Sequence, residues 1–169
     1  TIQFMKQNLL TVLKYADGAR CDMAHLILND VFGQTWKEEL DAWSYSKPSN
    51  EFWEVAIKDA KSKYPNAILL AEVYEDWEIE KLNQLGFDYC YDKALLDKLE
   101  GSAQDVNDYI HYKGESFYGH VAHFVENHDE NRVVYNMQGN LEKAKAAGTI
   151  ASTLGGMIFF NHGQWSGLK

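Results

Sequence analysis

Three acidic residues that could do acid and base chemistry stand at or just beyond segments rich in apolar residues. These residues are Asp22, Glu72 and Asp129, and Asp88 lies in a fourth such segment. When two carboxyl groups share a cleft, one can attack a carbon while ionised and the other can deliver a proton to a leaving oxygen. Hydrolysis of a glycosidic bond requires this pair of roles. The sequence therefore suggests a glycosidase site built from carboxyl groups that are distant along the chain.

The two roles require different surroundings, and Arg20 can supply part of the difference. Arg20 precedes Asp22 by two residues, so on a strand both side chains lie on the same face. A guanidinium at that place would hold Asp22 in its charged form. We therefore predict an ion pair between Arg20 and Asp22.

The elements that must position these residues alternate along the chain. Helical apolar spacing is found at residues 2–15, 51–63, 79–85, 93–111 (as one or two helices) and 141–154. Short apolar runs typical of strands lie at residues 19–23, 67–71, 86–91, 121–125 and 157–160. Asn50 or Ser49 is expected to cap the second helix.

Strands separated by helices of this length indicate parallel βαβ units, hence an α/β fold with five parallel strands. Such a series fits an open, doubly wound sheet or an arc of an eight-stranded barrel. In a barrel, the carboxyl ends of the strands face the active site. The acidic residues at the strand ends are therefore expected to converge.

Composition sets limits on the function. The chain has 169 residues, 46% of them hydrophobic and 24% charged, which is typical of one globular domain or part of a larger core. The net charge of -9 and pI near 5.1 argue against nucleic acid as a partner. No apolar run is long enough to span a membrane. Cys21 and Cys90 lie in apolar or aromatic surroundings and are expected to be buried free thiols, which slightly favours a cytoplasmic location.

Several short motifs carry a resemblance to one family. Residues 18–25 (GARCDMAH), 71–74 (AEVY) and 124–129 (FVENHD) resemble the fourth-, fifth- and seventh-strand motifs of the α-amylase family of retaining glycoside hydrolases, glycoside hydrolase family 13. Residues 86–89 and 156–164 are similar to its sixth- and eighth-strand regions. The resemblance covers nearly the whole chain, and the motifs occur in family order. It implies a partial TIM (β/α)8 barrel, with residues 1–169 forming one domain that holds strands four to eight.

The resemblance also implies roles for individual residues. Asp22 would be the nucleophile, Glu72 the general acid/base and Asp129 the third carboxylate, which stabilises the transition state. The residues implied in substrate binding are Arg20, His25, Tyr74 and His128. The substrate would be an α-glucan or oligosaccharide, cleaved at an α-glucosidic bond by double displacement, and no cofactor or metal is implied.

Two departures from the family pattern leave alternatives open. The third-strand motif Asp-x-x-x-x-Asn-His is absent, so the chain is either a fragment of a longer enzyme or an arc that associates with a second copy or another chain. Unpaired sheet edges favour association. In addition, His25 and Leu26 stand where many amylases have Lys and His. A glycosyltransferring relative with the same carboxylates and a catalytically inactive fragment are the alternative interpretations.

Other polar residues near the motifs have simpler interpretations. His120, His123 and His128 could suggest a metal, but His120 and His123 differ by an odd step and would face opposite ways on a strand. By the same parity Glu126 points away from Asp129 and is expected to be structural. Tyr74, Trp77 and Arg132 could equally line sugar subsites or serve in packing.

Overall fold

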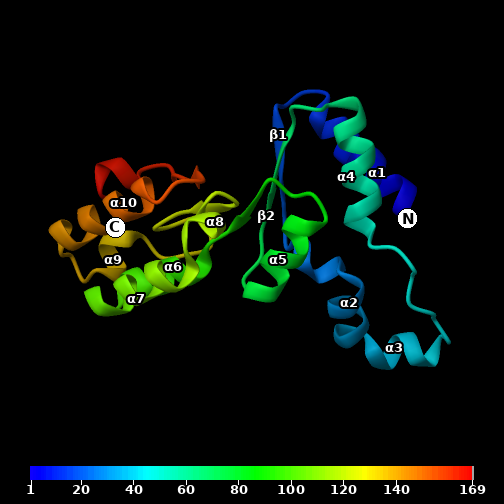
Figure 1. The fold of residues 1–169 in the computed structure, drawn as a ribbon, viewed down its shortest axis with the longest axis horizontal. Coiled ribbons are helices and arrows are strands. Elements are labelled where there is room, and N and C mark those ends of the chain that lie inside the picture. The colour runs from blue at the N-terminus through cyan, green and yellow to red at the C-terminus, as the bar shows by residue number, and fades with distance from the viewer. Residues whose placement is uncertain (169) are drawn as a thin grey trace. The chain divides into compact units, whose positions relative to one another are not determined.

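The computed structural model describes residues 1–168 and contains five parallel strands that alternate with helices (Figure 1). The strands are β1 (Gly18–Cys21), β2 (Ile68–Ala71), β3 (Tyr89–Tyr91), β4 (Val121–His123) and β5 (Met157–Ile158), in the order β1-β2-β3-β4-β5. The chain divides into two compact units, Thr1–Cys90 and the part from Tyr91 onward, so the boundary falls within β3. This arrangement confirms the predicted α/β fold with five parallel strands.

The first unit is built from two neighbouring strands and the helices around them. Its helices are α1 (Ile2–Leu13), η1 (Ala24–Ile27), α2 (Asn29–Thr35), α3 (Lys37–Ala42), α4 (Phe52–Lys63) and α5 (Asp76–Gln84). Helices α1 and α4 lie side by side (Figure 1). The register of β1 and β2 runs from Gly18 opposite Ile68 to Cys21 opposite Ala71, so both strands end at the same level.

Only glycine fits at position 18, the first residue of β1. A Cβ atom on Gly18 would collide with the backbone carbonyl oxygen of Ile68 on the neighbouring strand. Gly18 therefore permits the close approach that fixes the register, and this register places the residues after Cys21 beside those after Ala71.

Apolar burial holds this unit together. Leu13, Ile57, Leu69 and Leu82 are all buried between the strands and the helices. The ring of Trp53 packs edge-on against Phe87 with the ring centroids 4.9 Å apart, a favourable aromatic arrangement. Apolar contacts with the helices thus hold the strands in place, and polar residues follow the carboxyl ends of the strands.

The second unit contains β4, β5 and the remaining described helices. These helices are α6 (Lys93–Glu100), α7 (Ala103–Lys113), α8 (Glu115–Tyr118), α9 (Val133–Asn136), α10 (Leu141–Thr153) and η2 (Gln164–Ser166). Strands β4 and β5 pair in parallel, with Ala122 opposite Met157. The rings of Tyr91, Phe124 and Phe159 lie within 5.0 to 6.0 Å of one another and form an aromatic core.

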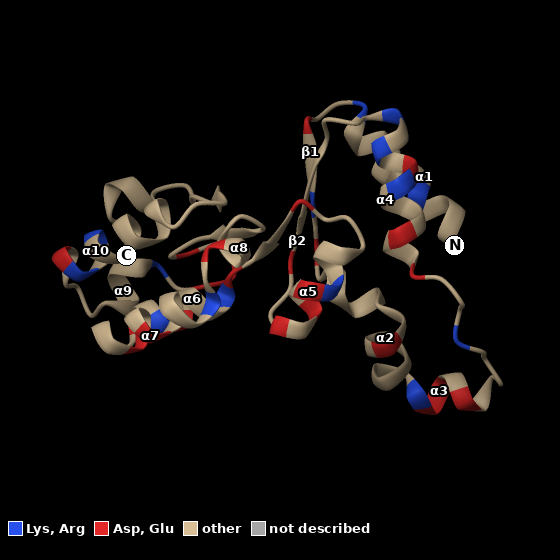
Figure 2. Ribbon diagram, viewed as in Figure 1, with Lys and Arg blue, Asp and Glu red and all other residues tan. Residues whose placement is uncertain are grey.

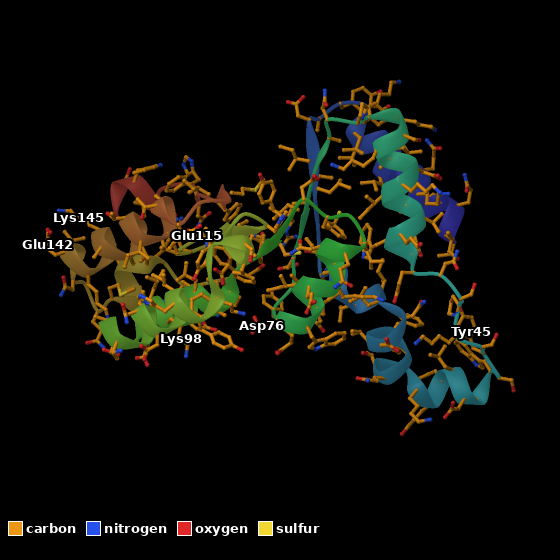
Figure 3. The ribbon with its side chains drawn as sticks, in the orientation of Figure 1. Tyr45, Asp76, Lys98, Glu115, Glu142 and Lys145 are labelled. Carbon is orange, nitrogen blue, oxygen red and sulfur yellow. The ribbon has the colours of Figure 1, made fainter. Side chains whose placement is uncertain are left out.

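Helix boundaries follow local signals in most places. The predicted helical stretch at residues 93–111 is two helices, because Gly101 ends α6 and Ser102 starts α7 with a capping box to Asp105. Glu142 and Lys145, labelled in Figure 3, form an ion pair of 2.8 Å in the first turns of α10. The expected helices at residues 2–15, 51–63, 79–85 and 141–154 are also present, with ends shifted by a few residues.

The predicted cap of the second helix is wrong. The N-cap residue of α4 is Glu51, and neither Asn50 nor Ser49 takes that place. Instead, the Asn50 carbonyl oxygen accepts a hydrogen bond of 3.1 Å from the Asn29 side chain, and the Glu51 carboxylate accepts one of 2.9 Å from the Asn29 backbone N–H. These residues close the loop that carries α2 and α3, two helices that are not among those expected from the sequence.

The acidic composition is visible on the surface of the molecule (Figure 2), and one of the two thiols is buried as expected. Figure 2 shows that acidic residues are spread over helices of both units, including α3, α5 and α7. Among the described residues no helix is both long and apolar enough to cross a membrane. Cys90 is a buried free thiol, as predicted, whereas Cys21 is free but only half-buried.

Candidate active site

The carboxyl ends of β1 and β2 are joined by a set of hydrogen bonds around Glu72. The Glu72 backbone N–H donates to the Cys21 carbonyl oxygen at 3.0 Å, and the Glu72 carbonyl oxygen accepts from the Ala24 N–H at 3.0 Å. Between these two contacts the chain turns at Met23, which has the left-handed values φ 42° and ψ 45°. This conformation is uncommon for a residue with a side chain. It accompanies a further bond of 2.7 Å from the Met23 N–H to Oε2 of Glu72.

Arg20 contacts both of the acidic residues in this unit. Its Nη1 forms an ion pair with Oδ1 of Asp22, which confirms the predicted pair, and its Nη2 lies 2.9 Å from Oε1 of Glu72. A guanidinium is planar and has several donors in a fixed arrangement, so one Arg can hold two carboxylates at a set separation. The structure therefore brings Asp22 and Glu72 together around a single cation.

The two carboxylates have contrasting surroundings. The Asp22 side chain is 76% exposed, whereas that of Glu72 is 3% exposed. Contrasting environments are the usual means by which paired carboxyl groups take different roles. An accessible carboxylate beside a cation suits attack on a substrate, and a buried carboxyl group held by several donors keeps a fixed orientation.

Tyr74 and His25 complete the surroundings of Glu72. The Tyr74 hydroxyl donates to Oε1 of Glu72 at 2.8 Å. The His25 ring is buried and lies edge-on to the Tyr74 ring, with centroids 5.8 Å apart. The Nδ1 atom of His25 is 3.5 Å from the Glu72 carbonyl oxygen. Of the residues assigned to substrate binding, His25 is thus largely enclosed by protein, while Tyr74 is half-buried.

A second buried acid, Glu78, lies near His25 and was missed by sequence reasoning. It belongs to α5, the helix that begins at Asp76, labelled in Figure 3. Burial raises the pKa of the Glu78 carboxyl group, and the nearby charge of His25 partly offsets this effect. A Glu in the first turn of a helix is normally read as a solvated charge, so no sequence signal marks it as buried.

Asp129 and His128 lie in the second unit, just beyond β4. Both side chains are 58% exposed, and Nε2 of His128 is 3.1 Å from Oδ2 of Asp129. Both side chains are therefore accessible from solvent. The loop that carries them is shaped by Asn127, whose side-chain oxygen accepts from the backbone N–H groups of Asp129 and Glu130, both at 2.8 Å.

Beneath these two residues lies a structural ion pair. Glu126 is fully buried, and its carboxylate accepts from Nη1 of Arg132 at 2.6 Å and from the Val133 N–H at 2.8 Å. The Asn161 side chain bridges to Oε1 of Glu126 at 3.3 Å and to the Asn127 carbonyl oxygen at 3.1 Å. Glu126 and Arg132 therefore stabilise the loop, in line with the structural role expected for Glu126.

His123 forms another buried pair that sequence reasoning did not identify. Its Nδ1 is 3.1 Å from Oδ2 of Asp92, and both side chains are fully buried. The other oxygen of Asp92 accepts from the Tyr109 hydroxyl at 2.6 Å and from the Leu95 N–H at 3.0 Å. Asp92 thus caps α6 and ties β4 to α7, while His120, the third histidine considered for a metal, lies outside β4 and is exposed.

Asp88 and Trp77 have no place in the contacts around Glu72. The Asp88 carboxylate is paired with Lys61 and accepts from the Leu69 N–H at 2.7 Å, near the start of β2. Trp77 is 51% exposed on α5. Asp88 therefore has a structural function at the other end of the strand.

Comparisons with known proteins find likeness at the level of structure. No family model and no curated protein matches the sequence. An α-amylase from Lactobacillus plantarum is similar to 96% of this chain, with 24% identity and a TM-score of 0.66. A debranching enzyme from Nostoc punctiforme is similar to 99% of it, with 15% identity and a TM-score of 0.71. A cyclic α-maltosyl-(1→6)-maltose hydrolase from Arthrobacter globiformis is similar to 94%, with 18% identity and a TM-score of 0.68.

The chain spans only part of these proteins. It covers 38%, 37% and 35% of their respective lengths. At such identities the likeness concerns the fold. The chain therefore has the α/β fold of part of an α-amylase-type catalytic barrel.

Proposed function

We propose that this chain carries catalytic carboxylates of a retaining glycosidase that acts on α-glucosidic bonds. The observation that supports the proposal most is the bridge from Arg20 to the exposed Asp22 and the buried Glu72. The names of the structural neighbours point to α-linked glucose as the substrate class. Asp129 is assigned the third carboxylate role from the resemblance of residues 124–129.

The first half of the reaction uses both bridged acids. An oxygen of Asp22 attacks the anomeric carbon while the bond from that carbon to the leaving oxygen breaks. Glu72 transfers its proton to the leaving oxygen, so the first product departs as a neutral alcohol and Asp22 becomes a glycosyl ester. Arg20 is positioned to keep Asp22 charged before attack and to fix its distance from Glu72.

The second half reverses the roles. Glu72, now a carboxylate, takes a proton from water as that water attacks the anomeric carbon, and the ester bond to Asp22 breaks. The Asp22 carboxylate and the protonated Glu72 are restored. Two inversions at one carbon retain the α configuration. Asp129 would bind ring hydroxyl groups more tightly as positive charge develops at the ring, which lowers the barrier.

The experiment compares the 169-residue chain with a version fused to barrel strands one to three of an α-amylase. Both are incubated with a maltooligosaccharide, new reducing ends are counted, and the anomer formed first is identified by proton NMR. We expect the fused version to release the α anomer and the isolated chain to be much weaker. Inactivity of the fused, folded protein, or release of the β anomer, would overturn the proposal.

A further inference from the structure

The hydroxyl group of Tyr74 faces the general acid/base rather than open solvent. It donates to Oε1 of Glu72 at 2.8 Å, within the range of a strong O–H···O bond. The ring is half-buried, and the buried His25 ring lies edge-on to it with centroids 5.8 Å apart. Both the ring and the hydroxyl group thus have protein neighbours that orient them.

The two oxygens of Glu72 are held in different ways. Oε2 accepts from the Met23 backbone N–H at 2.7 Å, and a backbone group in a fixed turn can move little. Oε1 accepts a hydrogen bond from the Tyr74 hydroxyl at 2.8 Å and forms an ion pair with Nη2 of Arg20 at 2.9 Å. Arg20 is shared with Asp22, whose charge disappears when it forms the glycosyl ester, so the hold by Arg20 changes during the reaction. Tyr74 is a neutral donor, and Asp22 takes no part in its hydrogen bond to Glu72.

We propose that Tyr74 is a positioning residue that fixes the carboxyl group of Glu72 through its hydroxyl, and is not mainly a platform for a sugar ring. The inference rests on the proposed function, because it assigns Glu72 the proton transfers. A carboxyl group that can rotate presents its proton to the leaving oxygen less often, and small losses of alignment cost large factors in rate. The phenol hydroxyl restricts this rotation.

The variant Tyr74→Phe separates the two roles, because it removes the hydroxyl group and retains the ring. A stacking platform would work equally well with Phe. The test uses the chain fused to barrel strands one to three of an α-amylase, called here the barrel-completed protein. We expect its kcat on a maltooligosaccharide to fall by about tenfold, with KM little changed. On α-glucosyl fluoride with azide added, neither the leaving group nor the attacking nucleophile needs a proton transfer from Glu72, so the fall should be less than about twofold. Tyr15→Phe is the matched control, since Tyr15 is 78% exposed on the surface.

A second measurement does not depend on activity. In the 169-residue chain labelled with ¹³C at Glu side-chain carboxyl groups, the Glu72 signal is assigned with Glu72→Gln, and its chemical shift is compared between variants at one fixed pH. Loss of the Tyr74 hydroxyl removes a hydrogen bond to the carboxyl group, so the Glu72 signal should move in Tyr74→Phe relative to the unaltered chain. Tyr15→Phe should leave this signal unchanged.

The outcomes distinguish this inference from the proposed function. An unchanged Glu72 chemical shift, or equal losses on both substrates, overturns the positioning role even if hydrolysis is observed. A changed Glu72 chemical shift in a protein without hydrolytic activity supports the contact between Tyr74 and Glu72 and counts against the glycosidase instead. A rise in KM alone would assign Tyr74 to substrate binding and overturn the inference.

Discussion

The Nη2 atom of Arg20 lies 2.9 Å from Oε1 of Glu72, and its Nη1 atom forms an ion pair with Oδ1 of Asp22. One side chain therefore links an exposed carboxylate at the end of β1 to a buried one at the end of β2. Because both strands end at the same level, the geometry follows from the register that Gly18 allows. The link makes the two acids a unit, and variants of each part should have distinct effects.

Replacement of Arg20 by Lys should uncouple the two acids. An ammonium group is compact and cannot reproduce the planar arrangement that contacts both carboxylates. We expect kcat of the barrel-completed protein to fall at least tenfold, although the charge is retained. Lys47→Arg is a control, since its pair with Asp30 lies on the surface. Normal activity in Arg20→Lys would show that charge alone suffices and that the bridge is unimportant.

Glu72→Gln should abolish general acid/base catalysis with little change in shape. The amide cannot deliver or accept the proton, and such groups contribute about 10² to 10⁴ in rate. The loss should be partly recovered on α-glucosyl fluoride when azide is added as a nucleophile that needs no base. Glu80→Gln on the exposed face of α5 is the control and should retain full activity. Equal activity of Glu72→Gln and the unaltered protein would remove Glu72 from the mechanism.

Trp53→Phe should weaken the turn that follows Asp22. The indole N–H donates to the buried Ala24 carbonyl oxygen at 2.8 Å, and Phe leaves that oxygen without this donor. The expected loss is about 1 to 3 kcal/mol in the free energy of unfolding, measured with urea. Trp43→Phe, at a residue that is 77% exposed, should change it little. Similar values for both variants would mean that the bond to Ala24 does not support the turn.

Asp92→Asn should destabilise the second unit. The Asp92 carboxylate accepts from Tyr109 and Leu95 and pairs with His123, and all of these contacts are buried. An amide retains the shape but loses the charge, so we expect a loss of about 2 to 3 kcal/mol in the free energy of unfolding. Asp97→Asn removes a pair with Lys93 at a side chain that is 58% exposed and should have a small effect. A neutral result for Asp92→Asn would show that the cluster contributes shape only.

The two thiols should resist alkylation in the folded chain. Burial raises the pKa of both Cys21 and Cys90 to about 12, so the reactive thiolate is scarce at pH 8. The unfolded thiols ionise near pH 9, hence the unfolded state gains stability relative to the folded state as pH rises from about 9 to 12. Mass spectrometry after iodoacetamide treatment at pH 8 should show little labelling without urea and two labels with it. Fast labelling without urea would contradict the raised pKa values of these thiols.

Much of the fold follows from local pattern. The short runs at residues 67–71 and 19–23 predict β2 and β1, because short apolar runs between helices are typical of parallel strands. The pair of Arg20 and Asp22 follows from strand parity. These features depend on neighbours in sequence, which is why they could be predicted.

The remaining features depend on contacts between distant residues. The left-handed turn at Met23 is set by its bond to Glu72, 49 residues away, and no turn-forming residue marks it. The burial of Glu78 and the pair of His123 with Asp92 likewise depend on packing across elements. The Asn29 contacts that close the loop of α2 and α3 join Asn29 to Asn50 and Glu51, which directly precede α4 and are distant from Asn29 in sequence.

Trapping the glycosyl ester is the most direct test of Asp22 as the nucleophile. The barrel-completed protein is incubated with 5-fluoro-α-glucosyl fluoride, which forms the ester readily and releases it slowly, and the peptides are analysed by mass spectrometry. We predict one added fluoroglucosyl group on Asp22. The label should be absent from Asp22→Asn and present in the control Asp17→Asn. A folded, hydrolytically active protein in which the label is on another residue, or in which none forms and the product anomer is inverted, would contradict this role of Asp22.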